Sequence, residues 1–70
     1  MENHLYSMEL KGWIARDRCG VLCLYDENPE RNEPQQFFLA LHYIELPINS
    51  FPEVTWENSP VEVTIKIEKV

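Results

Sequence analysis

The end of the chain places the strongest constraint on its fold. Apolar and polar residues alternate there, in the order Val61, Glu62, Val63, Thr64, Ile65, Lys66, Ile67 and Glu68. A period of two puts the apolar side chains on one face of a β-strand and the polar ones on the other. Pro60 marks the start of this strand, since proline cannot donate to a ladder. We therefore expect residues 61–70 to form a strand with one buried and one wet face.

A β-hairpin is predicted near the beginning of the chain. Residues 11–16 (KGWIAR) and residues 21–25 (VLCLY) are predicted to be its two strands. Residues 17–20 between them predict a tight turn, because Asp17 can bind its own downstream backbone and Gly20 supplies positive φ.

The remaining segments are less regular. Residues 1–10, with apolar Leu5, Tyr6, Met8 and Leu10, predict an added strand or a short turn. Residues 26–34 (DENPERNEP) hold two prolines and four acids and predict an exposed loop. Residues 37–43 (FFLALHY) predict a third strand, with a helical turn as the alternative. The two prolines that bracket residues 48–51 predict a compact loop or a single helical turn.

The short length of the chain limits how much of a sheet it can cover. Seventy residues make one domain, spanning 1–70, that buries only roughly 60% of its unfolded surface. The segment VLCLY is apolar on both faces, which is typical of a central strand covered on both sides. We therefore predict a mainly β fold of four to five antiparallel strands, able to curl into an open barrel, with at most one short helix. Self-association or a docked partner is expected to supply the missing cover.

The charge of the chain is unevenly distributed. Between Asp26 and Glu62 there are eight carboxylates and one base, Arg31, a balance of −7 within a chain whose net charge is −6. Nucleic acid is an improbable partner, because a duplex-binding surface needs a basic footprint. The acidic excess has two readings, solubility of a small domain or a face that docks on a basic host protein. The residues predicted to carry such a face are Asp26, Glu27, Glu30 and Glu33.

No targeting or membrane segment is apparent in the sequence. No basic region is followed by an apolar run, and no apolar stretch approaches the roughly 20 residues of a membrane helix. Cys19 and Cys23 lie four positions apart, where a disulfide would close a very short loop with little effect. Two free thiols favour a reducing compartment, so a cytoplasmic protein is predicted.

Metal and catalytic signatures are weak. Cys19, Cys23, His4 and His42 are the residue types of a zinc site, but the two histidines are 38 positions apart. Nothing local joins Cys19 to His42 as a nucleophile and base. With Gly12 and Gly20 as its two glycines, the chain has no phosphate-binding loop. The sequence predicts no enzyme, no metal and no cofactor.

A small-ligand site is the one alternative for which side chains can be named. Arg16 and Arg18 flank Asp17, and their guanidinium forks suit phosphate or carboxylate geometry. With aromatic rings they could hold a nucleotide by stacking and charge; the predicted set is Trp13, Arg16, Arg18, Tyr25 and Trp56. The structural alternatives are a local ion pair at Asp17, a core position for Trp13 and a lid position for Trp56.

Two stretches of the sequence carry a resemblance. They are residues 12–17 (GWIARD), followed by Gly20 and Leu24-Tyr25, and residues 51–63 (FPEVTWENSPVEV). Over roughly half the chain this pairing resembles a family of short, uncharacterised proteins encoded by phages and prophages of gut bacteria. Members commonly have an Asp-Gly type turn, and this chain departs from them by placing Cys19 before Gly20. The family has no established activity, so the resemblance implies context alone, a dispensable phage product acting in the bacterial cytoplasm.

Three functions are compatible with these observations. The first is a phage accessory protein that binds and inhibits or modulates a host defence protein through its acidic surface. The second is a protein that sequesters a nucleotide immune signal in a pocket at a subunit interface. The third is a virion or assembly component whose sheet edge pairs with a larger protein.

Overall fold

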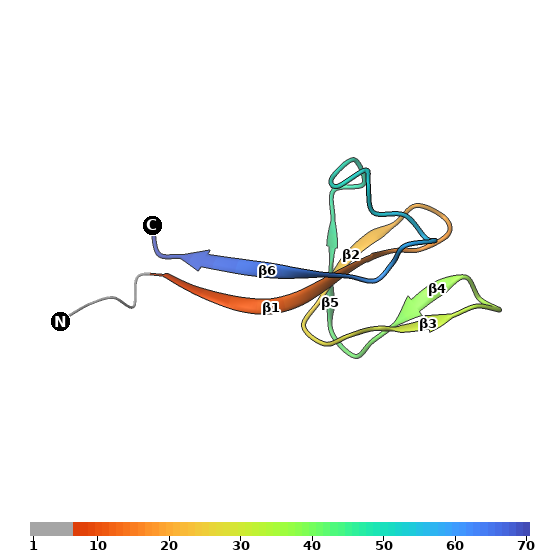
Figure 1. The fold of residues 1–70 in the computed structure, drawn as a ribbon, viewed down its shortest axis with the longest axis horizontal. Helices are drawn as coiled ribbons and strands as arrows, with labels where there is room; N and C mark the ends of the chain where they lie inside the picture. The colour runs from red at the N-terminus through yellow and green to blue at the C-terminus, as the bar shows by residue number, and fades with distance from the viewer. Residues whose placement is uncertain (1–6) are drawn as a thin grey trace.

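The computed structural model describes residues 7–70, and these residues form strands, turns and loops without a helix (Figure 1). The predicted absence of more than one short helix is thereby confirmed for this part of the chain. Residues 1–6, including the predicted contacts of Leu5 and Tyr6, lie outside the described residues. The strands are β1 (Ser7–Arg16), β2 (Leu22–Tyr25), β3 (Glu30–Asn32), β4 (Phe37–Leu39), β5 (Tyr43–Leu46) and β6 (Val61–Glu68).

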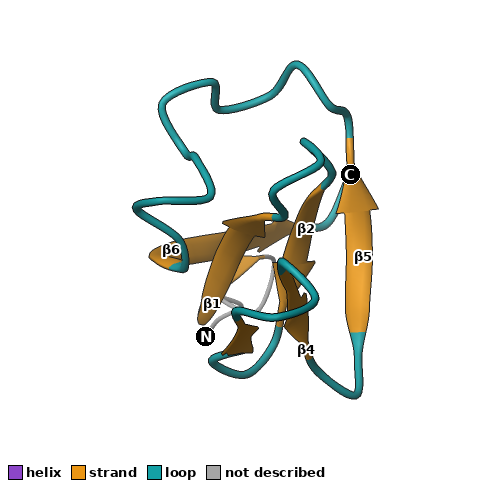
Figure 2. Ribbon diagram, turned by 90° about the vertical axis from the view of Figure 1, so that its right-hand side faces the viewer, coloured by secondary structure: helices purple, strands orange, loops and turns teal. Residues whose placement is uncertain are grey.

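Four of the strands form one antiparallel sheet in the order β5-β2-β1-β6, and β3 and β4 form a separate hairpin. The prediction of a small antiparallel sheet of four strands is confirmed, and the sheet stays open and does not close into a barrel. The edge strands β5 and β6 are joined by a long connection, residues 47–60. Figure 2 shows this connection crossing from one edge strand to the other.

The predicted first hairpin is present. β1 and β2 pair from Trp13↔Tyr25 to Arg16↔Leu22. The turn is closed by the Gly20 N–H, which donates to the Asp17 carbonyl over 2.9 Å, and Gly20 has a φ of 108°. That backbone conformation is open to glycine and strained for other residues, as expected from the position of Gly20 in the sequence.

The predicted final strand is also present, over Val61–Glu68. β6 pairs with β1 from Ser7↔Glu68 to Ile14↔Val61, so β1 begins at Ser7 and includes the second half of the predicted N-terminal segment. Its apolar face is only partly covered. Val61, Val63 and Ile65 are half-buried, and Ile67 is 48% exposed.

Two predictions about the middle of the chain are wrong. Residues 26–34 are not wholly a loop, because β3 lies within them and pairs with β4. Residues 37–43 are not one strand, because the chain bends at residues 40–42 and passes from the small hairpin into the main sheet. The physical reason is a tertiary contact. The guanidinium of Arg31 in β3 lies 3.7 Å from the ring centroid of Trp56, which holds the hairpin against the connection 47–60.

Each face of the central strand β2 carries its own small core. Leu22 packs with Ile14 and Val54 on one face. On the other face, Cys23 and Tyr25 pack in a cluster completed by Ala15, Phe38 and Trp56. The connection 47–60 thus covers both faces, since Val54 belongs to one cluster and Trp56 to the other.

This packing covers three of the five residues of the strand predicted at residues 21–25 within one chain, and Val21 and Leu24 are half-buried. The expected self-association or docked partner stays a prediction. Leu22, Cys23 and Tyr25 are 0%, 5% and 3% exposed within a single chain. The connection 47–60, which contains the compact loop predicted at residues 48–51, supplies this cover. It passes along the edge of β1 beyond Ile14, where β1 is not paired with β6.

Replacing Trp56 by alanine tests the second core. Trp56 is 7% exposed and meets the Phe38 ring edge-on at 5.3 Å. Removing so large a buried ring costs about 3–5 kcal/mol, which is comparable to the whole stability of a small domain. We expect Trp56→Ala to lose its cooperative urea transition. Leu41→Ala, at a side chain 89% exposed, should unfold within about 0.5 kcal/mol of the wild type; equal effects of the two substitutions would contradict the assigned core.

Candidate functional site

Arg16 is the predicted site residue with the most contacts, and all of them are internal. Its Nε donates to the Val54 carbonyl over 2.6 Å, and Nη1 donates to the carbonyls of Gly20 and Ile48 over 2.8 and 3.1 Å. Nη2 donates to the carbonyls of Ser50 and Phe51 over 2.8 and 3.2 Å. A guanidinium has five N–H donors, so each one has a backbone acceptor.

A saturated guanidinium cannot also grip an anion. The predicted clamp of Arg16 and Arg18 is therefore not formed: Arg16 fastens the start of the connection 47–60 to the sheet, while Arg18 is exposed on the turn. Ser59 fastens its other end, because its Oγ accepts from the Arg16 backbone N–H over 2.9 Å and donates to the Thr55 carbonyl. The role of Arg16 could not be read from the sequence, since its acceptors lie up to 38 positions away.

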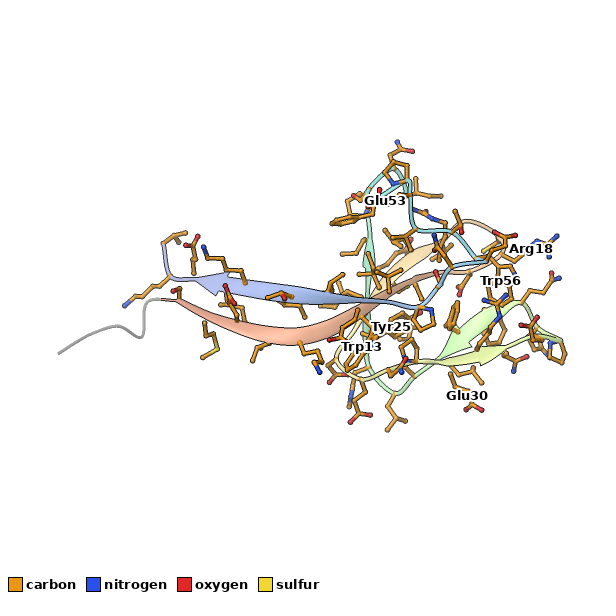
Figure 3. All side chains as sticks on the ribbon, viewed as in Figure 1. Trp13, Arg18, Tyr25, Glu30, Glu53 and Trp56 are labelled. Atoms are coloured by element: carbon orange, nitrogen blue, oxygen red, sulfur yellow. The ribbon has the colours of Figure 1, made fainter. Side chains whose placement is uncertain are left out.

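The predicted aromatic residues come together, but as core. Tyr25 and Trp56 belong to one buried cluster, and the half-buried Trp13 packs against it. The Trp56 ring is covered by the Arg31 guanidinium and by the edge of Phe38. In Figure 3, Arg18 and Trp56 lie toward one end of the molecule and Trp13 and Tyr25 nearer its middle. These side chains leave no pair of open rings between which a planar ligand could stack.

A groove of about 650 Å³ lies beside this cluster, between β4 and the strands β2 and β5. Its lining includes Asp17, Arg18, Cys23, Tyr25, Tyr43 and Glu45. The Phe38 backbone N–H donates to Asp17 Oδ1 over 2.9 Å, and the Arg18 N–H donates to the Gln36 carbonyl over 3.1 Å. These two bonds hold the small hairpin against the β1–β2 turn and so shape the groove.

Three titratable groups that line the groove, Asp17, Cys23 and Tyr25, have raised pKa values. Burial raises the pKa of the Cys23 thiol and that of the Tyr25 phenol, so both keep their protons at neutral pH. Burial also raises the pKa of Asp17, against the opposing effect of its bond from the Phe38 N–H. A protonated thiol is a poor nucleophile. Arg18 is the one arginine or lysine in the lining, which also includes the acidic residues Asp17 and Glu45, and this balance disfavours a phosphate-bearing ligand.

The predicted acidic residues form an exposed surface. Asp26, Glu27, Glu30 and Glu33 are all exposed, on β3 and the segments that flank it; we name these four residues the acidic surface. Glu30 is labelled in Figure 3, where it points away from the body of the molecule. The nearby cation Arg31 makes three contacts. Its Nη1 donates to the Trp56 carbonyl, its Nε donates to the Glu33 carboxylate, and its guanidinium stacks on the Trp56 ring.

The rest of the described chain offers little else of chemical interest. Among residues 7–70, no three His, Cys, Asp or Glu side chains are grouped closely enough to hold a metal ion. The same residues include no helix with the length and apolar character required to traverse a bilayer. Comparisons with protein-family models, curated proteins and solved structures gave no match.

Replacing Arg16 tests its role in holding the connection. Lysine has three N–H donors on one nitrogen and cannot reach five carbonyls spread around a planar fork. We expect Arg16→Lys to lower the free energy of unfolding by about 1–2 kcal/mol, measured by urea denaturation, because three part-buried carbonyls lose their donors. Arg18→Lys is the matched control and should change it by less than about 0.5 kcal/mol. Similar losses in both variants would show that the guanidinium of Arg16 is not specifically needed.

The raised pKa of Asp17 makes stability depend on pH in a defined direction. The folded chain holds this proton more tightly than the unfolded chain, so the Asp17 contribution to stability falls as pH rises from 3.8 through the folded pKa. Asp17→Asn keeps an oxygen that accepts from Phe38 but cannot ionise. We expect its unfolding free energy to gain on the wild type over that pH range, in urea titrations at successive pH values.

Asp17→Ala provides the control for this experiment. It also removes the charge, but it leaves the Phe38 N–H without its acceptor, which should cost about 1 kcal/mol relative to Asp17→Asn at every pH. Parallel stability curves for the wild type and Asp17→Asn would contradict the assigned pKa direction.

Proposed function

We propose that the chain is a binding protein, not an enzyme, and that it docks on another protein through the acidic surface. The observation that carries this proposal is the exposure of four carboxylates beside one arginine, Arg31, which among them pairs with Glu33. The negative charge of this region is therefore left largely uncompensated by the chain itself, and a basic patch on a partner would neutralise it.

The chemistry of such a surface suits association more than catalysis. Complementary charge speeds diffusional encounter and rejects partners of the wrong sign. Because exposed carboxylates remain hydrated until contact, their neutralisation by a basic partner has a lower desolvation cost than burial of isolated charges would have. The resemblance to phage-encoded proteins supports a host bacterial protein as the partner, with inhibition or modulation of its activity as the outcome.

The nucleotide-sequestering alternative has less support. It requires Arg16 as half of an anion clamp and exposed aromatic rings. Every N–H of the Arg16 guanidinium already donates to a backbone carbonyl, and Trp56 is 7% exposed. The one sizeable groove beside these residues is rimmed by Asp17 and Glu45. These contacts favour a protein partner over a nucleotide ligand.

Retention of bacterial proteins on the immobilised chain tests this proposal. We expect bound proteins to be released as salt rises from about 0.1 M to about 1 M, where the Debye length falls from about 10 Å to about 3 Å. A variant with the acidic surface neutralised (Asp26→Asn, Glu27→Gln, Glu30→Gln, Glu33→Gln) should retain none of them. The control neutralises three exposed acids elsewhere, by Glu53→Gln, Glu57→Gln and Glu62→Gln, and should retain the bound proteins. Loss in both variants alike, or no protein bound by the wild type, would overturn the proposal.

A further inference from the structure

The groove between β4 and the strands β2 and β5 takes no part in the proposed function, although its size suits a small ligand. Its volume of about 650 Å³ lies within the range of roughly 300–1,000 Å³ that is typical of ligand sites. Residues directly opposite each other in a sheet project from the same face. The floor of the groove consists of two such pairs, Tyr25↔Tyr43 and Cys23↔Glu45. Strand β4 forms its wall.

Aromatic side chains make up much of the lining, and one of them is open to solvent. They are Tyr25, Phe37, Phe38 and Tyr43. The Tyr25 ring is buried, whereas Tyr43 is 63% exposed, and the two ring centroids lie 6.2 Å apart. The face of an aromatic ring attracts cations, because the ring quadrupole is negative there. Tyr43 therefore offers a cation a contact that the buried rings do not.

Two carboxylates line the same groove, and neither has a cationic partner within the described chain. Asp17 comes from the β1–β2 turn and Glu45 from β5. The ion pairs formed among residues 7–70 involve other acids. Asp17 is half-buried, and burial raises the pKa of its carboxyl, whereas a cation beside it would lower that pKa. The groove thus holds acidic groups whose charge the described residues do not pair.

Arg18 is the one basic side chain able to compete for these carboxylates. It lines the groove, and its backbone N–H donates to the Gln36 carbonyl. Its side chain is exposed, and within residues 7–70 its guanidinium forms no ion pair with Asp17 or Glu45. The lining therefore has two acidic residues against one basic residue. The side-chain amides of Gln35 and Gln36 add carbonyl oxygens that accept hydrogen bonds.

We propose that this groove binds a small organic cation that carries an ammonium group. The ammonium would lie against the Tyr43 ring, with the carboxylates of Asp17 and Glu45 neutralising its charge. The carbon skeleton of the ligand would contact the apolar side chains of β4. An aromatic face combined with carboxylates suits a quaternary ammonium in particular, because such a group has no N–H donors and needs none here.

A free ligand fits the groove better than a side chain of a docked protein does. The lining includes none of the four residues of the acidic surface, so a protein seated on that surface need not enter the groove. The volume also accommodates a whole small molecule and not merely the end of one side chain. The site is therefore independent of the proposed function.

An NMR titration of the whole chain with choline tests the proposal. Choline carries a trimethylammonium group, and its neutral isostere has carbon in place of the quaternary nitrogen. We expect choline to shift the backbone amide signals of Gln36, Tyr43 and Glu45 in a saturable manner, and the isostere to bind more weakly. The absence of a saturable shift with choline, or equal affinity for the isostere, overturns the proposal.

A blocked lysine, acetylated at its α-amine and amidated at its carboxylate, shows which source of ammonium the groove prefers. Binding no tighter than that of choline supports a free ligand. Tighter binding overturns the free ligand in favour of a lysine side chain from another protein.

Substitution of Glu45 separates a built site from general attraction of cations to an acidic chain. Glu45→Gln should weaken choline binding by about two- to fivefold, because an exposed charge pair is lost. Glu53→Gln removes the same charge from an exposed position outside the groove and should leave the affinity unchanged (Figure 3). Equal weakening in the two variants would reduce the effect to net charge and overturn the site.

Substitution of Tyr43 tests the aromatic contact. Tyr43→Leu should weaken choline binding by about two- to fivefold, whereas Tyr43→Phe keeps the ring and should bind like the wild type. Because Tyr43 is exposed on an edge strand, both variants should fold, and unchanged amide signals outside the groove would verify this. Equal affinities of the two variants contradict a contact between the ring and the cation.

Arg18 supplies a change in the opposite direction. Arg18→Gln removes the one basic residue of the lining and should strengthen choline binding. Weaker binding by this variant would contradict a cation site. A chain that binds choline but retains no bacterial protein overturns the docking role of the acidic surface alone, and the converse result overturns the cation site alone.

Discussion

The Arg16 guanidinium is the interaction on which the arrangement of this small domain depends. Five backbone carbonyls converge on it, from Gly20 in the first turn and from four residues between positions 48 and 54. Within residues 7–70, the hydrogen bonds of its side chain all go to backbone carbonyls, so carbonyl dipoles and not a carboxylate stabilise the positive charge. Because a planar fork fixes the direction of every bond, it also fixes the path of the connection that must cover the sheet.

The path of the connection decides how a chain of this size can bury a central strand on both faces. Val54 is placed on one face of the sheet and Trp56 on the other, two positions later. Arg31 then stacks on Trp56 and draws the β3–β4 hairpin onto the second core. Arg16 orders the connection, the connection positions Trp56, and Trp56 positions the hairpin that carries the acidic surface.

Two exposed surfaces lie away from this ordered centre. The acidic surface lies on β3 and the segments that flank it, whereas the exposed residues Met8, Leu10 and Ile67 lie on the ribbon of β1 and β6, which projects from one end of the molecule (Figure 1). Their physical characters differ, since one carries charge that salt screens and the other apolar area that salt does not weaken.

The sequence by itself determined the local elements. The alternation of β6 and the Asp17–Gly20 turn were predicted, because period and turn chemistry are encoded by neighbouring residues. The exposure of the acidic residues followed from their composition. Tertiary structure alone decided that Arg16 and Trp56 are internal, that residues 37–43 divide between two sheets, and that the apolar residues Met8, Leu10 and Ile67 of β1 and β6 stay exposed. The hydrogen bonds from Arg16 to Val54 and from Arg31 to Trp56 span 38 and 25 positions, and such separations leave no mark on a local pattern.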